Sequence, residues 1–380
     1  MFMDISSELI HSLLPLFMVS LGASVSMIGL VEGIAEATSS ITKVFSGVTS
    51  DYFKNRKFPV VLGYGLAAIT KPIFPLATTI GWVLAGRFID RIGKGIRGAP
   101  RDALIADLVP KELRGTAYGL RQSLDTTGAF LGPVLAIVCM AWFANNLKAV
   151  MWVAVVPAFI AAGLIALAVK EPESSSDASL SQSRLKLSDV KRLTRRYWFI
   201  VVLGAVFSLA RFSEAFLILR ARDIGLAIGL VPLILIVMNV VYALLAYPAG
   251  VLSDRIPART LLLSGFSVLI ASDLVLAMAH SPMVVFLGAA LWGGHMALTQ
   301  GLLSKLIADT SPNDLRGTAF GVFNLFGGVA VLLASVIAGG LWTALGPSAT
   351  FFAGAAFAGF ALLGLVFFHP GSQELQKASH

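Results

Sequence analysis

The feature that most constrains the fold of this chain is an internal repeat. The segment LIADLVPKELRGTAYG at 104–119 recurs, without a gap, as LIADTSPNDLRGTAFG at 306–321. A second pair, GVTSD at 47–51 and GVLSD at 250–254, repeats with nearly the same offset. The chain is therefore expected to consist of two related halves that share one architecture.

The composition indicates that both halves lie in a membrane. Of the 380 residues, 57% are hydrophobic and 13% are charged, and the mean hydropathy is +0.83. A soluble domain carries about 25% charged residues. Apolar stretches of 18 residues or more are typical of transmembrane helices, and they recur along this chain. The net charge of +8 is better explained by the positive-inside rule than by nucleic-acid binding, because the basic residues lie in short loops.

The pattern predicts an all-α polytopic membrane protein with twelve transmembrane helices in two six-helix, pseudo-symmetric bundles. Duplicated bundles with a binding site between them are typical of secondary transporters. We expect an N-terminal bundle at 1–170, a cytoplasmic linker at 171–196, a C-terminal bundle at 197–369 and a cytoplasmic tail at 370–380. The predicted spans are 2–22, 27–50, 58–78, 81–108, 117–142, 147–169, 197–220, 226–253, 259–279, 282–308, 317–342 and 346–369.

The loop charges predict the orientation of the chain. If the N-terminus lies in the cytoplasm, the cytoplasmic loops receive most of the basic residues, and the opposite side keeps Lys148, Arg220 and Arg222 and little else. This bias predicts that both termini lie in the cytoplasm. The compact chain with short loops is typical of a bacterial protein, so the expected location is the inner (plasma) membrane.

Two loops resemble the cytoplasmic loop motif of the major facilitator superfamily, and the resemblance covers essentially the whole chain. In GVTSDYFKNRK the matching residues are Gly47, Asp51, Arg56 and Lys57. In the degenerate second copy, GVLSDRIPAR, they are Gly250, Asp254, Arg255 and Arg259. In that family the loop forms a charge latch that helps to hold the outward-facing state. The resemblance implies the same conformational role here.

The fourth predicted span begins with RFIDRIGKG, which is similar to the Arg-x-x-Gln-Gly-x-Gly motif of the family. Arg87 and Gly93 match, whereas Asp90 and Arg91 depart from it. The proton-relay role that the motif often has therefore does not carry over in detail.

The fifth predicted span contains GAFLGPVLA, which resembles the Gly-three-Gly-Pro motif of the family's antiporters. Gly128, Gly132 and Pro133 match, but Ala136 and Ile137 replace the closing pair of glycines. The resemblance implies the twelve-helix drug and metabolite proton-antiporter branch, and with it export.

The predicted spans contain an unusual number of charged residues, which are functional candidates because each is costly inside a membrane. On the fourth span, charges gather within an arc of about 80° on an ideal helix. This face must contact a water-filled cavity or acidic partners. Its members are Arg87, Asp90, Lys94, Arg97 and Arg101, with Asp102 near the edge.

Other spans supply partners for these charges. The candidates are Asp4, Glu8 and His11 on the first span, Glu32 and Glu36 on the second, Arg121 and Asp125 on the fifth, and Arg211 and Glu214 on the seventh. The pair Ser7-Glu8 recurs as Ser213-Glu214, which predicts equivalent cavity-lining positions in the two halves. Further embedded charges are Lys71, Asp273, His295 and Lys305.

Two interpretations of these charges compete. The first is a structural lattice of ion pairs, with Arg121–Asp125 and Arg101–Asp102 as leading members. The second is a binding and proton-coupling site. Glu8 and Glu32 are favoured for coupling because they are expected to have few local bases. The first choices are Glu8, Glu32, Glu36, Arg97 and Glu214.

The absent motifs limit the function further. The chain has no Walker-type loop, no His/Cys cluster with metal-ligand spacing and no Gly-x-Ser-x-Gly elbow, so we expect no enzyme activity, cofactor or metal. The sequence predicts proton-coupled export of a small organic molecule, anionic or zwitterionic, by alternating access. The expected partners are this substrate, protons and the lipid bilayer, without nucleic acid, and the protein is expected to function as a monomer. Alternatives are an uptake symporter for an organic anion, a cationic multidrug exporter and a non-transporting sensor or receptor.

Overall fold

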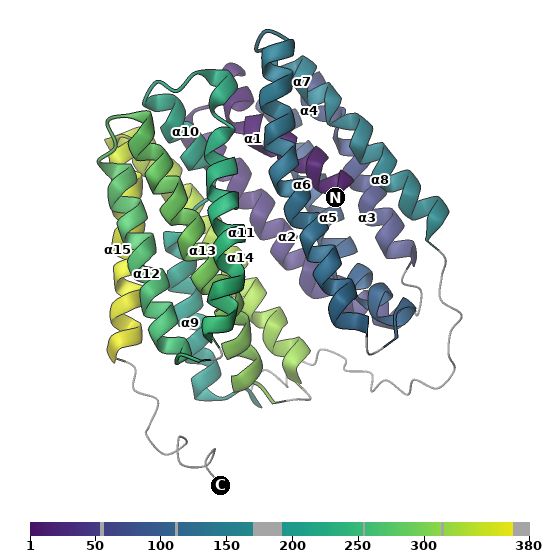
Figure 1. Ribbon diagram of the computed structural model, residues 1–380, viewed down its shortest axis with the longest axis vertical. Helices are drawn as coiled ribbons and strands as arrows, with labels where there is room; N and C mark the ends of the chain where they lie inside the picture. The colour runs from purple at the N-terminus through teal and green to yellow at the C-terminus, as the bar shows by residue number, and fades with distance from the viewer. Residues whose placement is uncertain (54–56, 111–112, 170–191, 254, 313–314, 368–380) are drawn as a thin grey trace.

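The computed structural model describes residues 1–53, 57–110, 113–169, 192–253, 255–312 and 315–367. In these ranges the fold is built from helices and has no strands. The all-helical prediction is therefore confirmed. Most helices run roughly parallel to one long direction of the molecule (Figure 1).

Residues 1–169 and residues 192–367 are called here the N-half and the C-half. The helices of the N-half are α1 (Phe2–Ser20), α2 (Val25–Phe53), α3 (Lys57–Thr70), α4 (Ile73–Leu76), α5 (Ile80–Leu108), α6 (Arg114–Trp142), α7 (Leu147–Val153) and α8 (Val155–Ala168). Those of the C-half are α9 (Arg195–Ala210), α10 (Ala215–Asp223), the short 3-10 helix η3 (Ile228–Leu230), α11 (Leu233–Ser253), α12 (Ala258–Ala277), α13 (Pro282–Thr310), α14 (Arg316–Leu345) and α15 (Pro347–Phe367).

Ten helical stretches of the described residues are long and apolar enough to cross a membrane. The helices α2 and α5 are not among the ten, although each has 29 residues. Both carry charged side chains along their length, which lowers their hydropathy. The polytopic membrane architecture agrees with the sequence, and the count of twelve transmembrane helices stays a prediction.

Three of the predicted spans contain a local break in the helix. The third breaks between α3 and α4, where Pro72 has no amide hydrogen and disfavours helix at Lys71. The sixth breaks at Ala154, between α7 and α8. The seventh breaks at residues 211–214, between α9 and α10. The sequence predicts one span for each of these segments, and each remains one apolar stretch long enough to cross a membrane. The breaks themselves are not predicted, because the hydropathy of a segment is unaffected by a local break.

The two halves meet along α2 and α14, which pack closely against each other. Small residues allow this approach. A Cβ atom on Gly29 would collide with the carbonyl oxygen of Ser335, and one on Gly33 would lie 2.9 Å from a methyl carbon of Leu332. Glycines spaced four residues apart on a membrane helix let two backbones come together in this way. The interface therefore depends on the absence of side chains at these positions.

The two ends of the molecule differ in how the halves meet. The linker end is the end where α8 finishes and α9 begins, and the opposite one is the far end. At the far end α6 contacts η3 and α1 contacts α10. The hydroxyls of Ser26 and Thr343 also lie 2.8 Å apart across the halves. From there the ribbons of α6 and α11 diverge toward the linker end (Figure 1).

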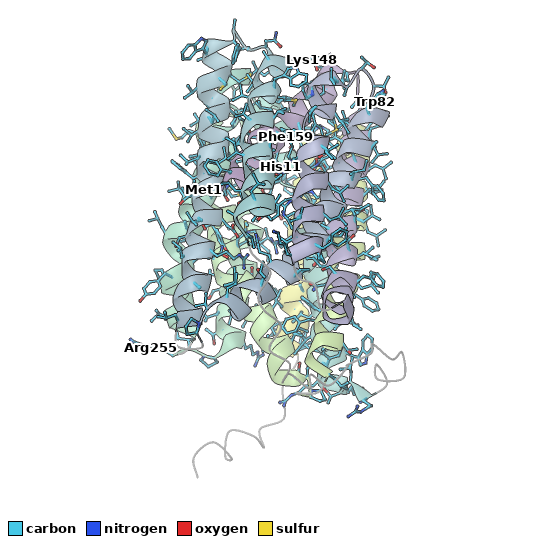
Figure 2. All side chains as sticks on the ribbon, turned by 90° about the vertical axis from the view of Figure 1, so that its right-hand side faces the viewer. Met1, His11, Trp82, Lys148, Phe159 and Arg255 are labelled. Carbon is cyan, nitrogen blue, oxygen red and sulfur yellow. The ribbon has the colours of Figure 1, made fainter. Side chains whose placement is uncertain are left out.

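A side view fixes the position of several side chains along the molecule. Lys148 and Trp82 lie near the far end, Arg255 lies at the linker end, and His11 lies between them (Figure 2). His11 is buried. A titratable side chain is therefore held in the interior, at mid-height between the two ends.

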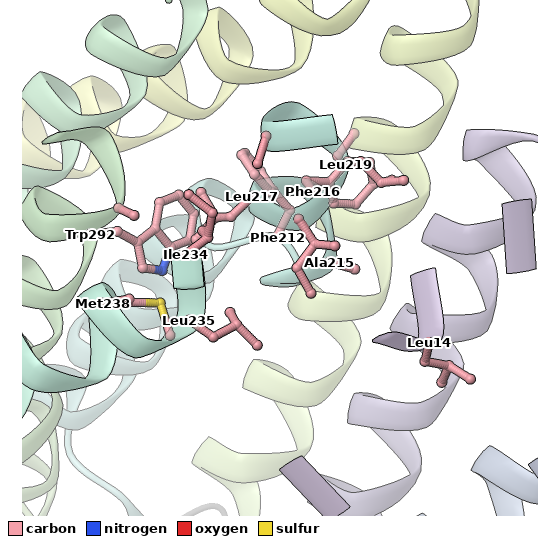
Figure 3. Packing of buried hydrophobic residues seen from close by; sticks show 14 of the residues in the cluster. Leu14, Phe212, Ala215, Phe216, Leu217, Leu219, Ile234, Leu235, Met238 and Trp292 are labelled. Atoms are coloured by element: carbon pink, nitrogen blue, oxygen red, sulfur yellow. The ribbon is translucent and has the colours of Figure 1, made fainter. Parts of the chain in front are cut away.

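Aromatic side chains fill the interior of the C-half. Phe212, in the break between α9 and α10, has its ring centroid 5.3 Å from those of Phe216 and Trp292 and 5.5 Å from that of Phe351. All four side chains are buried. Figure 3 shows Phe212, Phe216 and Trp292 within this cluster. The break is thus anchored by the packing of Phe212 as well as by the backbone hydrogen bonds from Phe216 to Ser213 and from Leu217 to Glu214.

The close approach of α2 and α14 predicts a large effect of a small substitution. Gly29→Ala should destabilise the protein by about 1–3 kcal/mol, because the added methyl group meets backbone that cannot move freely. The measurement is the apparent unfolding temperature of purified protein in detergent.

Gly163→Ala on α8 is the matched control, because a Cβ atom there would have nothing within 4 Å. This substitution should be neutral or stabilising, since alanine favours a helix over glycine. Equal unfolding temperatures for the two variants would show that the interface is looser than described.

Candidate functional site

Two acidic residues of α2 pair with two arginines of α5. Arg87 Nη2 lies 2.5 Å from Glu32 Oε2, and Arg91 Nη2 lies 3.1 Å from Glu36 Oε1. Both acids and both arginines are four residues apart, so each pair occupies one face of its helix, one turn from the other pair. Glu32 and Arg87 are 0% and 3% exposed. Charges this deeply buried need a partner, and the pairing supplies it.

A third ion pair joins the break between α3 and α4 to α5. The ammonium of Lys71 lies 2.8 Å from Asp90 Oδ1 and donates a hydrogen bond of 3.0 Å to the hydroxyl of Ser7 on α1. Lys71 is 1% exposed. The contact ties α1, α5 and the interrupted third segment together. Asp90 is therefore engaged in a buried structural pair.

Polar contacts cross from the N-half to the break between α9 and α10. Arg87 Nη2 lies 3.2 Å from His11 Nδ1, and the other ring nitrogen of His11 lies 3.9 Å from a carboxyl oxygen of Glu214. The Ser213 hydroxyl donates a hydrogen bond of 3.4 Å to Glu32 Oε2. We call these five residues the cross-half network. Arg87 is its centre, because it contacts both residues of the N-half that reach the C-half.

A second group of charged side chains keeps contact with solvent between the halves. Lys94 is exposed, and the side chains of Glu36 and Glu214 are 37% and 31% exposed. Glu214 interacts electrostatically with Glu8, Glu36, Arg211 and Lys94. These five residues are called the central set. It combines acids and bases from α1, α2, α5 and the α9–α10 break.

The central set is suited to binding a charged molecule. Lys94 forms no ion pair within the described part of the chain, so its ammonium is available to an anion. The carboxylates of Glu8 and Glu214 both interact with Lys94 and therefore face the same region, where they present negative charge to a cation. Across the described residues, no group of three or more His, Cys, Asp or Glu side chains is placed to hold a metal ion.

Arg97 has a different environment from the one that its mid-span position indicates. Its guanidinium stacks 4.6 Å from the ring centroid of Tyr64 on α3. The residue is 6% exposed and lies against Gly63. The side chain therefore packs between α3 and α5 and does not join the central set.

A separate ionic cluster joins α5 to α6 nearer the linker end. Arg121 lies 3.1 Å from both Asp102 and Asp125, and Arg101 lies 3.3 Å from Asp102 and 3.8 Å from Asp125. The two arginines and two aspartates balance in charge. Their mutual arrangement is that of a clamp between the two helices, as the lattice interpretation expects.

The glycine motif of α6 forms the contact with α1. A Cβ atom on Gly132 would lie 2.7 Å from that of Glu8, and one on Gly128 would lie 2.7 Å from that of Asp4. Pro133 is buried in the same helix. Asp4 itself binds the α-amino group of Met1 at 2.9 Å. The motif therefore sets how close Glu8 lies to α6.

The predicted loop latches lie partly outside the described residues. Arg56 and Asp254 lie outside them, as does the side chain of Asp51. Of the remaining members, Gly47 lies on α2, Gly250 lies on α11, Lys57 begins α3, and Arg255 is exposed between α11 and α12. The latch contacts stay a prediction.

Sequence reasoning missed some of the partners. The expectation that Glu32 has few local bases was wrong, because Arg87 binds it directly. Arg91 was noted only as a departure from a motif, yet it pairs with Glu36. Its position four residues after Arg87 matches the spacing of the two acids, which is the signal that identifies it.

The pair of Lys71 and Asp90 predicts an asymmetric response to mutation. Lys71→Met should destabilise the protein by about 3–5 kcal/mol, because it leaves a buried carboxylate without its partner. The double variant with Asp90→Asn should recover much of this loss. Unfolding in detergent, monitored by circular dichroism, measures both.

Asp223→Asn is the matched control for this pair. Asp223 binds Arg220, but the Arg220 guanidinium also donates to backbone carbonyls of residues 276, 277 and 279, so it keeps partners when Asp223 is neutral. Its effect should be below about 1 kcal/mol. If Lys71→Met were no worse than this control, the buried pair would not be structural.

Comparison with known proteins places this geometry in a family. The sequence profile of the Major Facilitator Superfamily matches residues 1–220 and 214–379. An uncharacterized MFS-type transporter of Methanocaldococcus jannaschii is 35% identical over 364 residues, covering 93% of this chain and 89% of its own.

Solved structures of transporters share the fold. A POT family transporter in complex with a thioalcohol-conjugated peptide superposes with a TM-score of 0.79 at 13% identity, covering 96% of this chain and 93% of its own. The nucleoside transporter NupG has a TM-score of 0.76 at 15% identity, with coverages of 96% and 95%. The human organic anion transporter MFSD10 has a TM-score of 0.65 at 18% identity, with 96% of both chains covered. This chain belongs to the Major Facilitator Superfamily and is a non-enzymatic membrane transporter.

Proposed function

We propose that this protein exports a small zwitterionic molecule in exchange for protons, by alternating access of the central set to the two sides of the membrane. The observation that carries the proposal is the central set itself. It holds solvent-accessible acids and bases side by side between the two halves. A substrate with both charges matches such a surface better than one with a single charge.

The anionic group of the substrate is assigned to Lys94 and Arg211. The other cations of the region are already neutralised, since Arg87 binds Glu32, Arg91 binds Glu36 and Lys71 binds Asp90. Lys94 is exposed, and Arg211 lies at the α9–α10 break. A substrate carboxylate or phosphate would form charge-assisted hydrogen bonds to these two side chains.

The cationic group of the substrate is assigned to Glu8 and Glu214. A proton on either carboxylate removes the negative charge that binds this group, so protons and substrate compete for the same residues. Competition of this kind couples the outward movement of substrate to the inward movement of protons. The resemblance of Gly128, Gly132 and Pro133 to the antiporter motif supports the same direction.

A substrate with only an anionic group would reverse the coupling. Its negative charge beside Glu8 and Glu214 would favour proton uptake by these acids, so substrate and proton would move together. The exposed ammonium of Lys94 favours this second candidate, an uptake symporter for an organic anion. The direction of proton flux therefore separates the two.

The cross-half network is proposed to change during transport. His11–Glu214 and Ser213–Glu32 join opposite halves, so both contacts must break or change partners when the halves rock. We propose that the protein works as a monomer of two bundles in the inner membrane, with both termini in the cytoplasm.

The proposal predicts substrate-dependent proton movement in liposomes that contain purified protein and an internal pH dye. The probes are a panel of amino acids, monocarboxylates and quaternary ammonium ions, added under an imposed proton gradient. A zwitterion should drive protons in the direction opposite to its own. Proton movement in the same direction as an anion would support the symporter, and solute movement without proton flux would contradict coupling in either form.

Charge-neutral variants assign the two ends of the substrate. Lys94→Gln should raise the half-saturating concentration about ten- to hundred-fold, which corresponds to the loss of a hydrogen bond to a charged group. Glu214→Gln should retain solute exchange and lose proton flux. Lys148→Gln is the matched control, because Lys148 is an exposed lysine at the far end. A loss of the same size in this control would show that the effect of Lys94 is not specific.

A further inference from the structure

Asp273 on α12 carries a buried carboxyl group that takes no part in the ion pairs described above. It is 0% exposed, and neither carboxyl oxygen has a hydrogen-bond partner among the described residues. The other acids of the interior discussed above pair with a base or keep contact with solvent. An unpartnered carboxylate inside a membrane protein is very costly, whereas the neutral acid is tolerated there.

The carboxyl group lies directly behind the break between α9 and α10. A Cβ atom placed on Gly354 of α15 would lie 2.6 Å from Asp273 Oδ2 and 2.9 Å from the ring of Phe212. The carboxyl group and the ring therefore meet at the same glycine. Phe212 stands next to Ser213 and close to Glu214, the two residues that contact the N-half.

The position of Asp273 along α12 adds to this arrangement. It lies four residues before Ala277, the last residue of the helix, and thus about one turn inside the far end. That is the end at which η3 and α10 contact the N-half. If the halves separate there, the two residues that follow Phe212, Ser213 and Glu214, lose their contacts with the N-half.

The titratable groups around Asp273 do not neutralise it. On α13, His295 packs its ring against Phe207 and Trp292, and its ring nitrogens are buried. The break contributes Arg211, whose guanidinium lies 5.8 Å from the ring centroid of Phe207, and Glu214, which faces the central set. The helix α15 has no charged residue.

We propose that Asp273 is a proton-binding site of the C-half, covered by Phe212 in this state and opened to water when the halves separate at the far end. In the covered state the acid holds its proton. In the opened state the proton passes to water and the carboxylate is hydrated. This site deepens the proposed coupling to protons, and it is separate from the central set.

The protonation state can be measured on the protein alone by infrared spectroscopy, which detects the carbonyl stretch of a protonated carboxylic acid. The wild-type protein at neutral pH should show such a band that is missing from both Asp273→Asn and Asp273→Leu. Asp223→Asn is the control, because Asp223 is paired with Arg220 and should contribute no such band. A band that is unchanged in both Asp273 variants would overturn the proposal.

The dependence on conformation is tested with a reversible lock. Ser26→Cys and Thr343→Cys in a Cys139→Ala background place two thiols where hydroxyls lie 2.8 Å apart, so a disulfide should hold the far end closed. The Asp273 band should persist at alkaline pH in the oxidised protein and disappear after reduction. The same pH response in both forms would contradict the opening to water.

These readouts need no substrate. A failure to find transport would contradict the proposed function, whereas the infrared result on Asp273 would still stand. A missing Asp273 band would contradict this inference, whereas the proposal of substrate-coupled proton flux through Glu8 and Glu214 would still stand.

Discussion

The structure depends on how the charges of α5 are satisfied inside a membrane. This helix carries Arg87, Asp90 and Arg91 into the protein interior, where an unpaired charge is not tolerated. Their partners come from α2 and from the break that follows α3, so these elements must pack against α5 at one register. The breaks in the third and seventh segments serve the same need for partners, since each presents polar side chains to the interior.

The charges divide into two groups with different tasks. Those that are buried and paired hold the N-half together, and the clamp between α5 and α6 extends this frame toward the linker end. Those of the central set keep contact with solvent, although Glu36 also pairs with Arg91 and Glu214 lies 3.9 Å from His11. The proposed exchange of substrate for protons is assigned to this set. Arg87 is one of the buried, paired charges and also links the N-half to the C-half, because its partners Glu32 and His11 contact Ser213 and Glu214.

The interiors of the two halves differ in chemistry, since most of the buried ion pairs in the described part of the chain lie in the N-half. The interior of the C-half is largely aromatic and apolar, and the carboxyl oxygens of Asp273 and the ring nitrogens of His295 have no hydrogen-bond partner among the described residues. The two repeated halves therefore share the arrangement of helices, whereas the charged residues of the N-half interior have few counterparts in the C-half.

Much of the fold follows from the sequence, because hydrophobic length and the internal repeat determine where helices run. The breaks do not follow, since Pro72 alone signals one of them and residues 211–214 have no comparable marker. For the site, helical periodicity identified the charged face of α5 but not its neighbours. Periodicity gives the direction of a side chain, whereas the pairing of Glu32 with Arg87 depends on how two helices pack.

The central claim is that the two halves alternate about the central set, and the distance between them at the far end tests it most directly. Spin labels at Lys148→Cys and Arg222→Cys, in a Cys139→Ala background, place one probe on each half at exposed positions. Pulsed electron paramagnetic resonance in liposomes should find the close approach described here together with a longer distance. The longer population should change when pH or a transported solute changes. A single distance that is the same under all these conditions would contradict the account.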